Sequence, residues 1–257
     1  MLKKDRLDQI IKLLQSKGVV EVSALCRIFR VTEMTVRRDL DELSEKGLII
    51  RTHGGAILSE DNILVEQPYE ARLLLNSEKK EAIAKAALDI IKDGQKIYLD
   101  SGTTTLALAR AIDNTQRLVI ITNAINIAME LNMRLNISVI SIGGELRKNA
   151  LSCTGHFAED MIKKLRVDLA FTGVGGLGEN GELYSGSIVE AGVKQLLMEI
   201  SNQTVILADS SKIGHEDFVS FGNLKDIDYL ITDSKAPAHI LDKYREMGVQ
   251  VIIADLD

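Results

Sequence analysis

A run of small, hydroxyl-bearing residues has the composition of an anion-binding loop. The run is Ser101-Gly102-Thr103-Thr104-Thr105, which follows a predicted strand and opens a predicted helix. Free backbone N–H groups and the positive end of a helix attract negative charge, and hydroxyls add further donors. Lys212 can supply a countercharge, while the carboxylate of Asp100 and the amide of Asn123 suit the hydroxyls of a sugar or polyol. Taken alone, the run is more typical of an ordinary helix cap.

Four further loops of small and polar residues also follow predicted strands. They are Thr122-Asn123, Gly143-Gly144, Gly173-Val174-Gly175-Gly176 and Asp209-Ser210-Ser211-Lys212. Loops that follow parallel strands meet at one edge of the sheet, where open α/β sheets bind ligands. Convergence of five such loops favours a ligand site over a set of unrelated caps, and it indicates an anionic small molecule.

Seven short Val/Ile/Leu-rich runs are predicted to be the strands that position these loops. The predicted strands are residues 96–100, 117–121, 137–142, 168–172, 204–208, 228–232 and 249–253. Helix-like stretches separate most of them, and continuous apolar strands alternating with helices are typical of a mainly parallel sheet covered on both faces. We therefore expect an α/β fold for this part of the chain.

Several other functional classes lack support in the sequence. The segment Gly173–Gly178 satisfies the GxGxxG pattern after a strand, but a turn follows it at Glu179–Glu182 where a dinucleotide site requires a helix. No P-loop sequence is present, and four scattered histidines give no metal-ligand spacing. We expect neither a cofactor nor a metal. Two cysteines, no signal peptide and no long apolar run favour a cytoplasmic protein that does not enter a membrane.

The first fifty-seven residues predict three helices. The first has an apolar stripe at helical spacing, which consists of Leu7, Ile10, Ile11 and Leu14. A second is expected over residues 22–29, with a stripe of Leu25, Ile28 and Phe29. The third begins after Thr32, whose hydroxyl can cap it, ends at Gly47, and buries Val36, Leu40 and Leu43.

The polar face of the third helix carries Thr35, Arg37 and Arg38 near its N-terminal end, close to the capping Thr32. In a helix-turn-helix, the N-terminal residues of the second helix of the motif contact base edges in the major groove. Arginine can form two hydrogen bonds to one guanine, and threonine can contact a phosphate or a thymine methyl group. Periodicity alone leaves open a surface helix whose arginines are merely solvated.

A short β-wing is predicted after the third helix, over Leu48–Ala56, where strand-forming residues precede a glycine turn. Its Arg51 and His53 are candidates for contacts with the sugar-phosphate backbone or the minor groove. Residues 1–57 carry 11 basic and 8 acidic side chains, a charge of 11 − 8 = +3, whereas the remainder carries 20 − 29 = −9. This asymmetry allows one end of the chain to approach phosphates.

The N-terminal pattern resembles the DeoR family of bacterial regulators. The resemblance rests on Arg6, Ile10 and Leu14, on the segment Thr32–Leu40, and on Arg51-Thr52-His53-Gly54-Gly55-Ala56. Members usually have serine where this chain has Thr32, and often isoleucine at Val36. The resemblance implies a winged helix-turn-helix over residues 1–57 that binds double-stranded operator DNA. A connector with Pro68 and Arg72 follows over residues 58–76.

The remaining segment, residues 77–257, resembles the effector domain of the same family. The matching landmarks are Lys79, Asp100–Thr105, Thr122-Asn123, Gly143-Gly144 with Arg147, Asp168–Gly173 and Asp209–Gly214. Such domains are related to ribose-5-phosphate isomerase and bind phosphorylated sugars or sugar alcohols. The resemblance therefore implies a transcriptional repressor of a carbohydrate-metabolism operon, released from its operator by such an effector. Because one short recognition helix seldom binds tightly alone, we also expect a homo-oligomer, at least a dimer.

Two alternatives remain open. A sugar-phosphate isomerase-like enzyme with an accessory DNA-binding domain would use titratable groups around the ligand, namely Asp100, Asp168, Glu190, Lys194 and Lys212. Against it, Glu190 and Lys194 lie four residues apart on a predicted helix, where a surface ion pair is expected, and an isomerase has no use for a winged helix. A purely oligomerising domain explains the sheet but not its polar edge.

Overall fold

The computed structural model describes residues 3–17, 19–52, 54–58, 69–148 and 150–256. Two compact units make up the chain, an N-terminal unit, Met1–Leu75, and a C-terminal unit, Asn76–Asp257. Among the described residues, no helix is both long and apolar enough to cross a membrane.

The N-terminal unit combines helices with a small antiparallel sheet. Its helices are α1 (Lys3–Lys17), α2 (Val22–Phe29), α3 (Glu33–Glu45) and α4 (Tyr69–Leu74). Its strands are β1 (Val19–Glu21), β2 (Ile49–Arg51) and β3 (Gly55–Leu58), in the order β1-β3-β2. The three predicted helices and the β-wing are confirmed, and helix α4 forms within the segment expected to be a connector.

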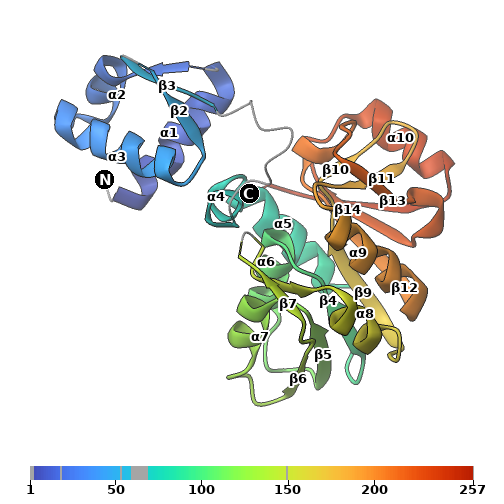
Figure 1. Cartoon of the computed structure of the whole chain (residues 1–257). Coiled ribbons are helices and arrows are strands. Elements are labelled where there is room, and N and C mark those ends of the chain that lie inside the picture. Colours follow the sequence, from blue (N-terminus) through green and yellow to red (C-terminus); the bar gives the residue numbers. More distant parts are fainter. Residues whose placement is uncertain (1–2, 18, 53, 59–68, 149, 257) are drawn as a thin grey trace. The chain divides into compact units, whose positions relative to one another are not determined.

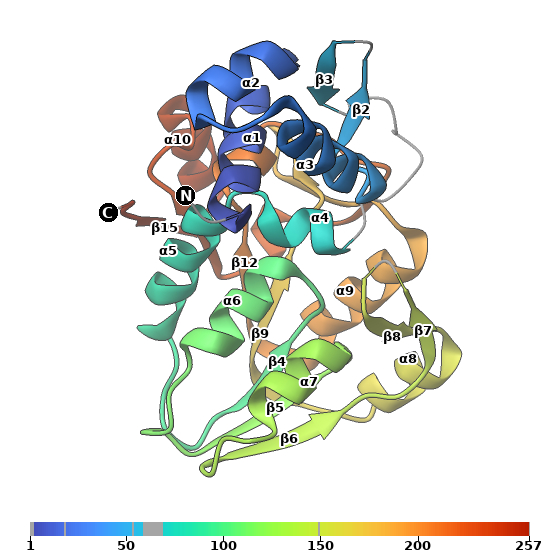
Figure 2. The same cartoon turned by 90° about the vertical axis from the view of Figure 1, so that its left-hand side faces the viewer.

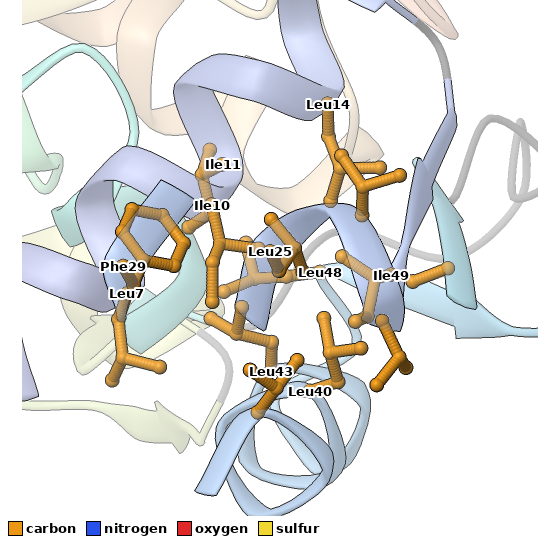
Figure 3. Close-up of a cluster of buried hydrophobic side chains, with 14 residues drawn as sticks. Leu7, Ile10, Ile11, Leu14, Leu25, Phe29, Leu40, Leu43, Leu48 and Ile49 are labelled. Atoms are coloured by element: carbon orange, nitrogen blue, oxygen red, sulfur yellow. The ribbon is translucent and has the colours of Figure 1, made fainter. Parts of the chain in front are cut away.

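The apolar stripes of α1, α2 and α3 meet in one core (Figure 3). The stripe of α2 differs from the expected one, because Ile28 is 51% exposed while Val22, Leu25 and Phe29 are buried. Ile28 lies about 100° around the helix from Phe29, and this turns it away from the core. Burial of each large apolar side chain contributes about 1.5–3 kcal/mol.

A buried ion pair fixes α3 against α1. Arg6 donates from Nε to Asp39 Oδ2 at 2.5 Å and from Nη2 to Asp39 Oδ1 at 3.0 Å. The hydrogen bond to Asp39 raises the pKa of the Arg6 guanidinium above its ordinary value. Two parallel hydrogen bonds fix the relative orientation of the two side chains as well as attracting them. This pair therefore sets the orientation of α3 relative to α1.

A seven-stranded parallel sheet forms the centre of the C-terminal unit, in the order β15-β14-β12-β9-β4-β5-β6. Its strands are β4 (Lys96–Leu99), β5 (Leu118–Thr122), β6 (Ile137–Ser141), β9 (Val167–Gly173), β12 (Ser201–Leu207), β14 (Tyr229–Asp233) and β15 (Gln250–Ala254). Each corresponds to a predicted strand, with ends shifted by at most three residues. The α/β fold class is therefore confirmed.

Helices cover both faces of this sheet (Figures 1 and 2). One face carries α5 (Ser77–Leu88), α6 (Thr103–Ala111) and α7 (Ile125–Leu131), and the other carries α8 (His156–Ile162), α9 (Ile188–Ile200) and α10 (Ala238–Glu246). The inner side chains of α8 and α9 pack with Tyr98 of β4 in one core. The described part of this unit also contains two 3₁₀ helices, η1 (Ser210–Lys212) and η2 (Leu224–Asp226).

Two smaller antiparallel sheets accompany the large one. The first contains β10 (Gly176–Leu177), β11 (Glu182–Ser185) and β13 (Val219–Asn223), and the second is a hairpin of β7 (Glu145–Arg147) and β8 (Ser152–Thr154). The segment Gly173–Gly178 thus contains strand β10, and a turn follows it at Gly181, where φ is 85°. The expectation that no helix follows the GxGxxG pattern is confirmed.

Candidate functional site

Five polar loops meet at the carboxyl edge of the parallel sheet. They follow β12, β9, β4, β5 and β6, which are consecutive neighbours in the sheet. Asp100 follows β4, Asn123 follows β5, and Gly173 ends β9. The convergence expected from the sequence is therefore present, and it places chemically useful side chains from distant parts of the chain at one edge.

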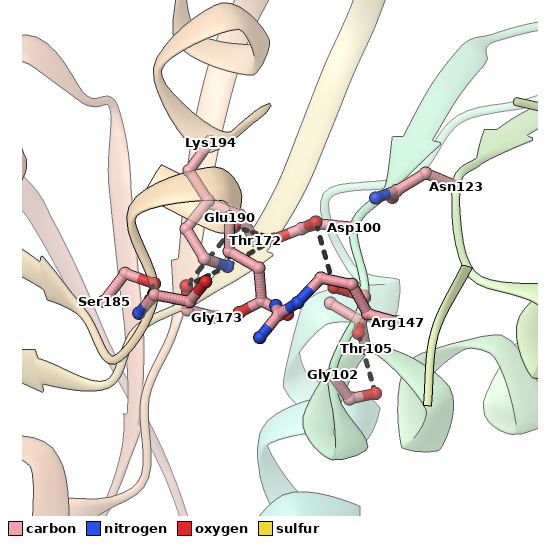
Figure 4. A network of polar contacts seen from close by, with 12 residues as sticks. Asp100, Gly102, Thr105, Asn123, Arg147, Thr172, Gly173, Ser185, Glu190 and Lys194 are labelled. Atoms are coloured by element: carbon pink, nitrogen blue, oxygen red, sulfur yellow. Dashed lines mark hydrogen bonds and ion pairs between the residues drawn. The ribbon is translucent and has the colours of Figure 1, made fainter. Parts of the chain in front are cut away.

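A buried lysine holds the central carboxylate of this edge. Lys194 of α9 donates from Nζ to Asp100 Oδ2 at 2.5 Å, to Thr172 Oγ1 at 3.1 Å and to the carbonyl oxygen of Gly173 at 3.0 Å. Asp100 is 1% exposed and Lys194 is 4% exposed. The three ammonium donors thus have three protein acceptors. Figure 4 shows this network between α9 and the end of β4.

A second ion pair joins the β7–β8 hairpin to the same helix. Arg147 Nη1 lies 2.5 Å from Glu190 Oε1, and both side chains are mostly buried. Glu190 lies four residues before Lys194, so one face of α9 contributes both charges to the edge (Figure 4). The pair connects a loop after β6 to a helix that follows β11.

These contacts correct the expectation of a surface ion pair between Glu190 and Lys194. Both are buried, and each pairs with a distant residue, Arg147 and Asp100 respectively. The sequence signal that pointed to this was the apolar character of the whole of α9, because Ala191, Val193 and Leu197 are also buried. Charged residues inside such a helix have to find partners within the protein.

The Ser101–Thr105 run turns from β4 into α6 as expected. Gly102 is the residue before the helix, and Thr105 donates from Oγ1 to the Gly102 carbonyl at 3.0 Å. Gly102 has φ +156°, and a β-carbon there would lie 3.1 Å from Thr105 Oγ1. The first backbone N–H groups of a helix have no partner within the helix. Thr103 is buried and Thr104 half-buried.

The remaining predicted residues of this edge have varied surroundings. Thr122 is fully buried, and its Oγ1 accepts from the Ala124 N–H at 3.0 Å, which stabilises the turn after β5. Gly144 lies so close to β8 that a β-carbon would be 2.6 Å from the Thr154 carbonyl oxygen, whereas Gly143 has open space beside it. Lys212 of η1 is half-buried, and its ammonium group has no hydrogen-bond or ion-pair partner within the described part of the chain.

The N-terminal unit presents the predicted DNA-contacting residues at the start of α3. Thr32 caps the helix, since its side chain accepts from the Thr35 N–H at 3.4 Å. Arg37 is exposed but bonded to Glu33 through Nη2 at 2.6 Å. Arg38 is exposed, and its guanidinium has no partner among the described residues.

The two candidate DNA-contacting residues of the wing, Arg51 and His53, differ in what the structure shows of them. Arg51 of β2 lies 3.3 Å from Asp41 Oδ1 of α3 and is only partly exposed. His53 lies outside the described residues, so its expected DNA contact stays a prediction.

A cleft of about 800 Å³ lies between β1, α2, α3 and the wing, lined by Ser23, Cys26, Arg37 and Thr52 among others.

Within the described ranges, no group of three or more histidine, cysteine, aspartate or glutamate side chains could hold a metal ion. At the carboxyl edge, Asp100 instead pairs with Lys194, and Glu190 pairs with Arg147. An N-terminal winged helix-turn-helix joined to an α/β unit is an arrangement typical of transcriptional regulators.

Comparison with known proteins identifies the family. Residues 6–62 match the DeoR-like helix-turn-helix domain, and residues 75–234 match the DeoR C terminal sensor domain. This chain belongs to the DeoR family of transcriptional regulators.

Similar proteins match over nearly the full length. The HTH-type transcriptional regulator GolR of Listeria innocua is 36% identical, covering 98% of both chains. The glycerol-3-phosphate regulon repressor of Escherichia coli is 32% identical, covering 98% of this chain and 99% of that one. The lactose phosphotransferase system repressor of Staphylococcus epidermidis is 37% identical, covering 91% and 93%.

Among solved structures, ribose 5-phosphate isomerase A of Methanocaldococcus jannaschii aligns with a TM-score of 0.41 and 21% identity, over 54% of this chain and 55% of that one. The near-full-length relatives are regulators, and they favour the regulator over the isomerase-like enzyme.

Proposed function

We propose that this regulator represses a carbohydrate-metabolism operon and leaves its operator when a phosphorylated sugar or sugar alcohol binds the C-terminal unit. In this proposal residues 1–57 bind double-stranded DNA and residues 77–257 bind the effector. Residues 58–76 connect these two domains. It acts in the cytoplasm as a homo-oligomer, because paired half-sites supply the affinity that one short helix lacks.

The single observation that carries the proposal is the convergence of five polar loops at one edge of the parallel sheet. In the proposed complex, the start of α6 and the ammonium of Lys212 hold the phosphate, while Asn123 and Arg147 contact the hydroxyl-bearing part. Relatives named for a glycerol-3-phosphate regulon and a lactose phosphotransferase system support a phosphorylated carbohydrate as the effector.

The network around Lys194 argues against this lysine as the cation of an isomerase. An isomerase needs a cation near the substrate to stabilise an enediolate. All three donors of Lys194 already bond to Asp100, Thr172 and Gly173, so Lys194 serves to hold the edge together.

Thermal-shift screening with a panel of sugar phosphates tests the proposal, because a ligand that binds only the native state raises its melting temperature. We expect one or more phosphorylated sugars or polyols to stabilise the protein, and their unphosphorylated forms to have no effect. Stabilisation by none of them would contradict the effector proposal and would favour a purely oligomerising domain. Turnover of a stabilising compound would instead support an enzyme.

A further inference from the structure

Two buried polar atoms at the carboxyl edge have no partner among the described residues, Oδ1 of Asn123 and Oγ of Ser152. Asn123 is 2% exposed and Ser152 is fully buried. Burying a polar group without a hydrogen bond destabilises the folded state, and nearly all such groups in proteins are paired. Two such atoms on adjacent segments therefore require an explanation.

The backbone brings these two residues side by side. The Asn123 carbonyl accepts from the Cys153 N–H at 2.7 Å, and the Asn123 Nδ2 donates to the Cys153 carbonyl at 3.1 Å. An isolated antiparallel bridge pairs Ala124 with Ser152. The loop after β5 is thus attached to β8, and the Asn123 amide is oriented by a bond that leaves its oxygen available.

The orientation of Ser152 follows from the register of the β7–β8 hairpin. Ser152 lies directly opposite Arg147, and directly opposed residues in an antiparallel pair project from the same face. Arg147 reaches Glu190 of α9 from that face. Ser152 therefore projects toward α9 and the polar edge, and Figure 4 shows the Asn123 amide directed toward Asp100 at the same edge.

We infer that Ser152 and Asn123 form a subsite that binds the hydroxyl groups of the effector. An amide oxygen accepts from a hydroxyl, and a serine hydroxyl both donates and accepts, so together they match neighbouring hydroxyls on a sugar or polyol chain. Arg147 adds donors on the same face of the hairpin. The inference rests on the proposed function and assigns to Ser152 a role in selecting the hydroxylated part of the ligand.

Ser152→Ala is the variant that tests the subsite. It removes an unpaired buried hydroxyl, so the melting temperature of the free protein should stay the same or rise. Binding of a hydroxylated ligand should weaken about tenfold, the effect of one lost hydrogen bond. Binding of inorganic phosphate, which has no hydroxylated chain, should not change.

The probes are ribose 5-phosphate, fructose 6-phosphate, glycerol 3-phosphate and inorganic phosphate, measured by thermal shift and calorimetry on the full chain. Thr232→Val is the matched control. Thr232 is also fully buried with an unpartnered Oγ1, but it lies on β14, and three strands of the sheet separate β14 from β5. The control should bind every probe like wild type.

The outcomes separate the two claims. If wild type binds a sugar phosphate and Ser152→Ala binds it equally well, the subsite is wrong while the proposed function stands. If Ser152→Ala melts well below wild type and loses inorganic phosphate as well, Ser152 has a structural role and the inference also fails. If wild type binds none of the organic probes, the proposed function fails, and the inference fails with it.

Discussion

Lys194 Nζ lies 2.5 Å from Asp100 Oδ2, and this contact attaches the middle of α9 to the carboxyl end of β4. The two residues are 94 positions apart in the sequence. Asp100 is extensively bonded within the protein, because Oδ2 also accepts from Thr172 Oγ1 at 2.5 Å and Oδ1 accepts a longer bond from Ser101 Oγ at 3.5 Å. Asp100 therefore helps to hold the polar loops of this edge together.

Lys194→Met is expected to lower the free energy of unfolding by about 3–5 kcal/mol, because it leaves the Asp100 carboxylate buried without its countercharge. The double variant Asp100→Asn with Lys194→Met should recover part of this loss. Urea unfolding of wild type, both single variants and the double variant gives the coupling energy. Lys163→Met, which removes an exposed pair with Glu159, is the control. A loss below about 1 kcal/mol for Lys194→Met would contradict this role of the ion pair.

Glu190→Gln is expected to increase affinity for phosphorylated ligands. Glu190 Oε1 lies 2.5 Å from Arg147 Nη1, so the hydroxyl-bearing part of a ligand has to compete with Glu190 for the donors of Arg147. Weakening a pair of this kind by about 1 kcal/mol corresponds to roughly fivefold tighter binding. Calorimetry measures the change, with Glu159→Gln on α8 as the control. Weaker binding by Glu190→Gln would mean that Glu190 contacts the ligand.

Tyr98→Phe is expected to reduce the decrease in the free energy of unfolding that occurs at alkaline pH. Burial raises the pKa of the Tyr98 hydroxyl well above 10.0, and the nearby charge of Asp100 raises it further. Above pH 10 the unfolded chain releases this proton while the folded chain keeps it, so stability falls as pH rises. The contribution is about 1.4 kcal/mol per pH unit at most. Urea unfolding at about pH 8 and about pH 11 compares the two proteins, and equal alkaline losses would contradict this assignment.

Most of the fold was predictable because its signals are local. Each strand of the parallel sheet is a short apolar run, and the loop after it has small or polar residues. The Thr32 cap was likewise predictable, since its hydroxyl and the Thr35 N–H are three residues apart. The hairpin β7–β8 was not predicted, because its strands have three residues each and, unlike the wing, no glycine marks the turn between them.

The pairing within the site was not predictable because it depends on distance in space. Arg147 and Glu190 are polar residues in separate segments, and nothing local specifies that they meet. Arg51 shows the same effect, since its expected role at the DNA backbone competes with Asp41 at 3.3 Å. Spacing identified which residues lie at the edge, but only the structure shows which of their atoms are already bonded.

The most direct test of the account is the fluorescence anisotropy of labelled DNA from upstream of the chain's own gene, titrated with the sugar phosphate found by screening. Wild type should bind the DNA and release it as the ligand is added. Arg38→Ala, which removes an exposed arginine of α3, should lose DNA affinity but keep ligand binding, while Lys212→Ala should bind DNA and fail to release it. Wild-type DNA binding that no concentration of the ligand changes would contradict the account.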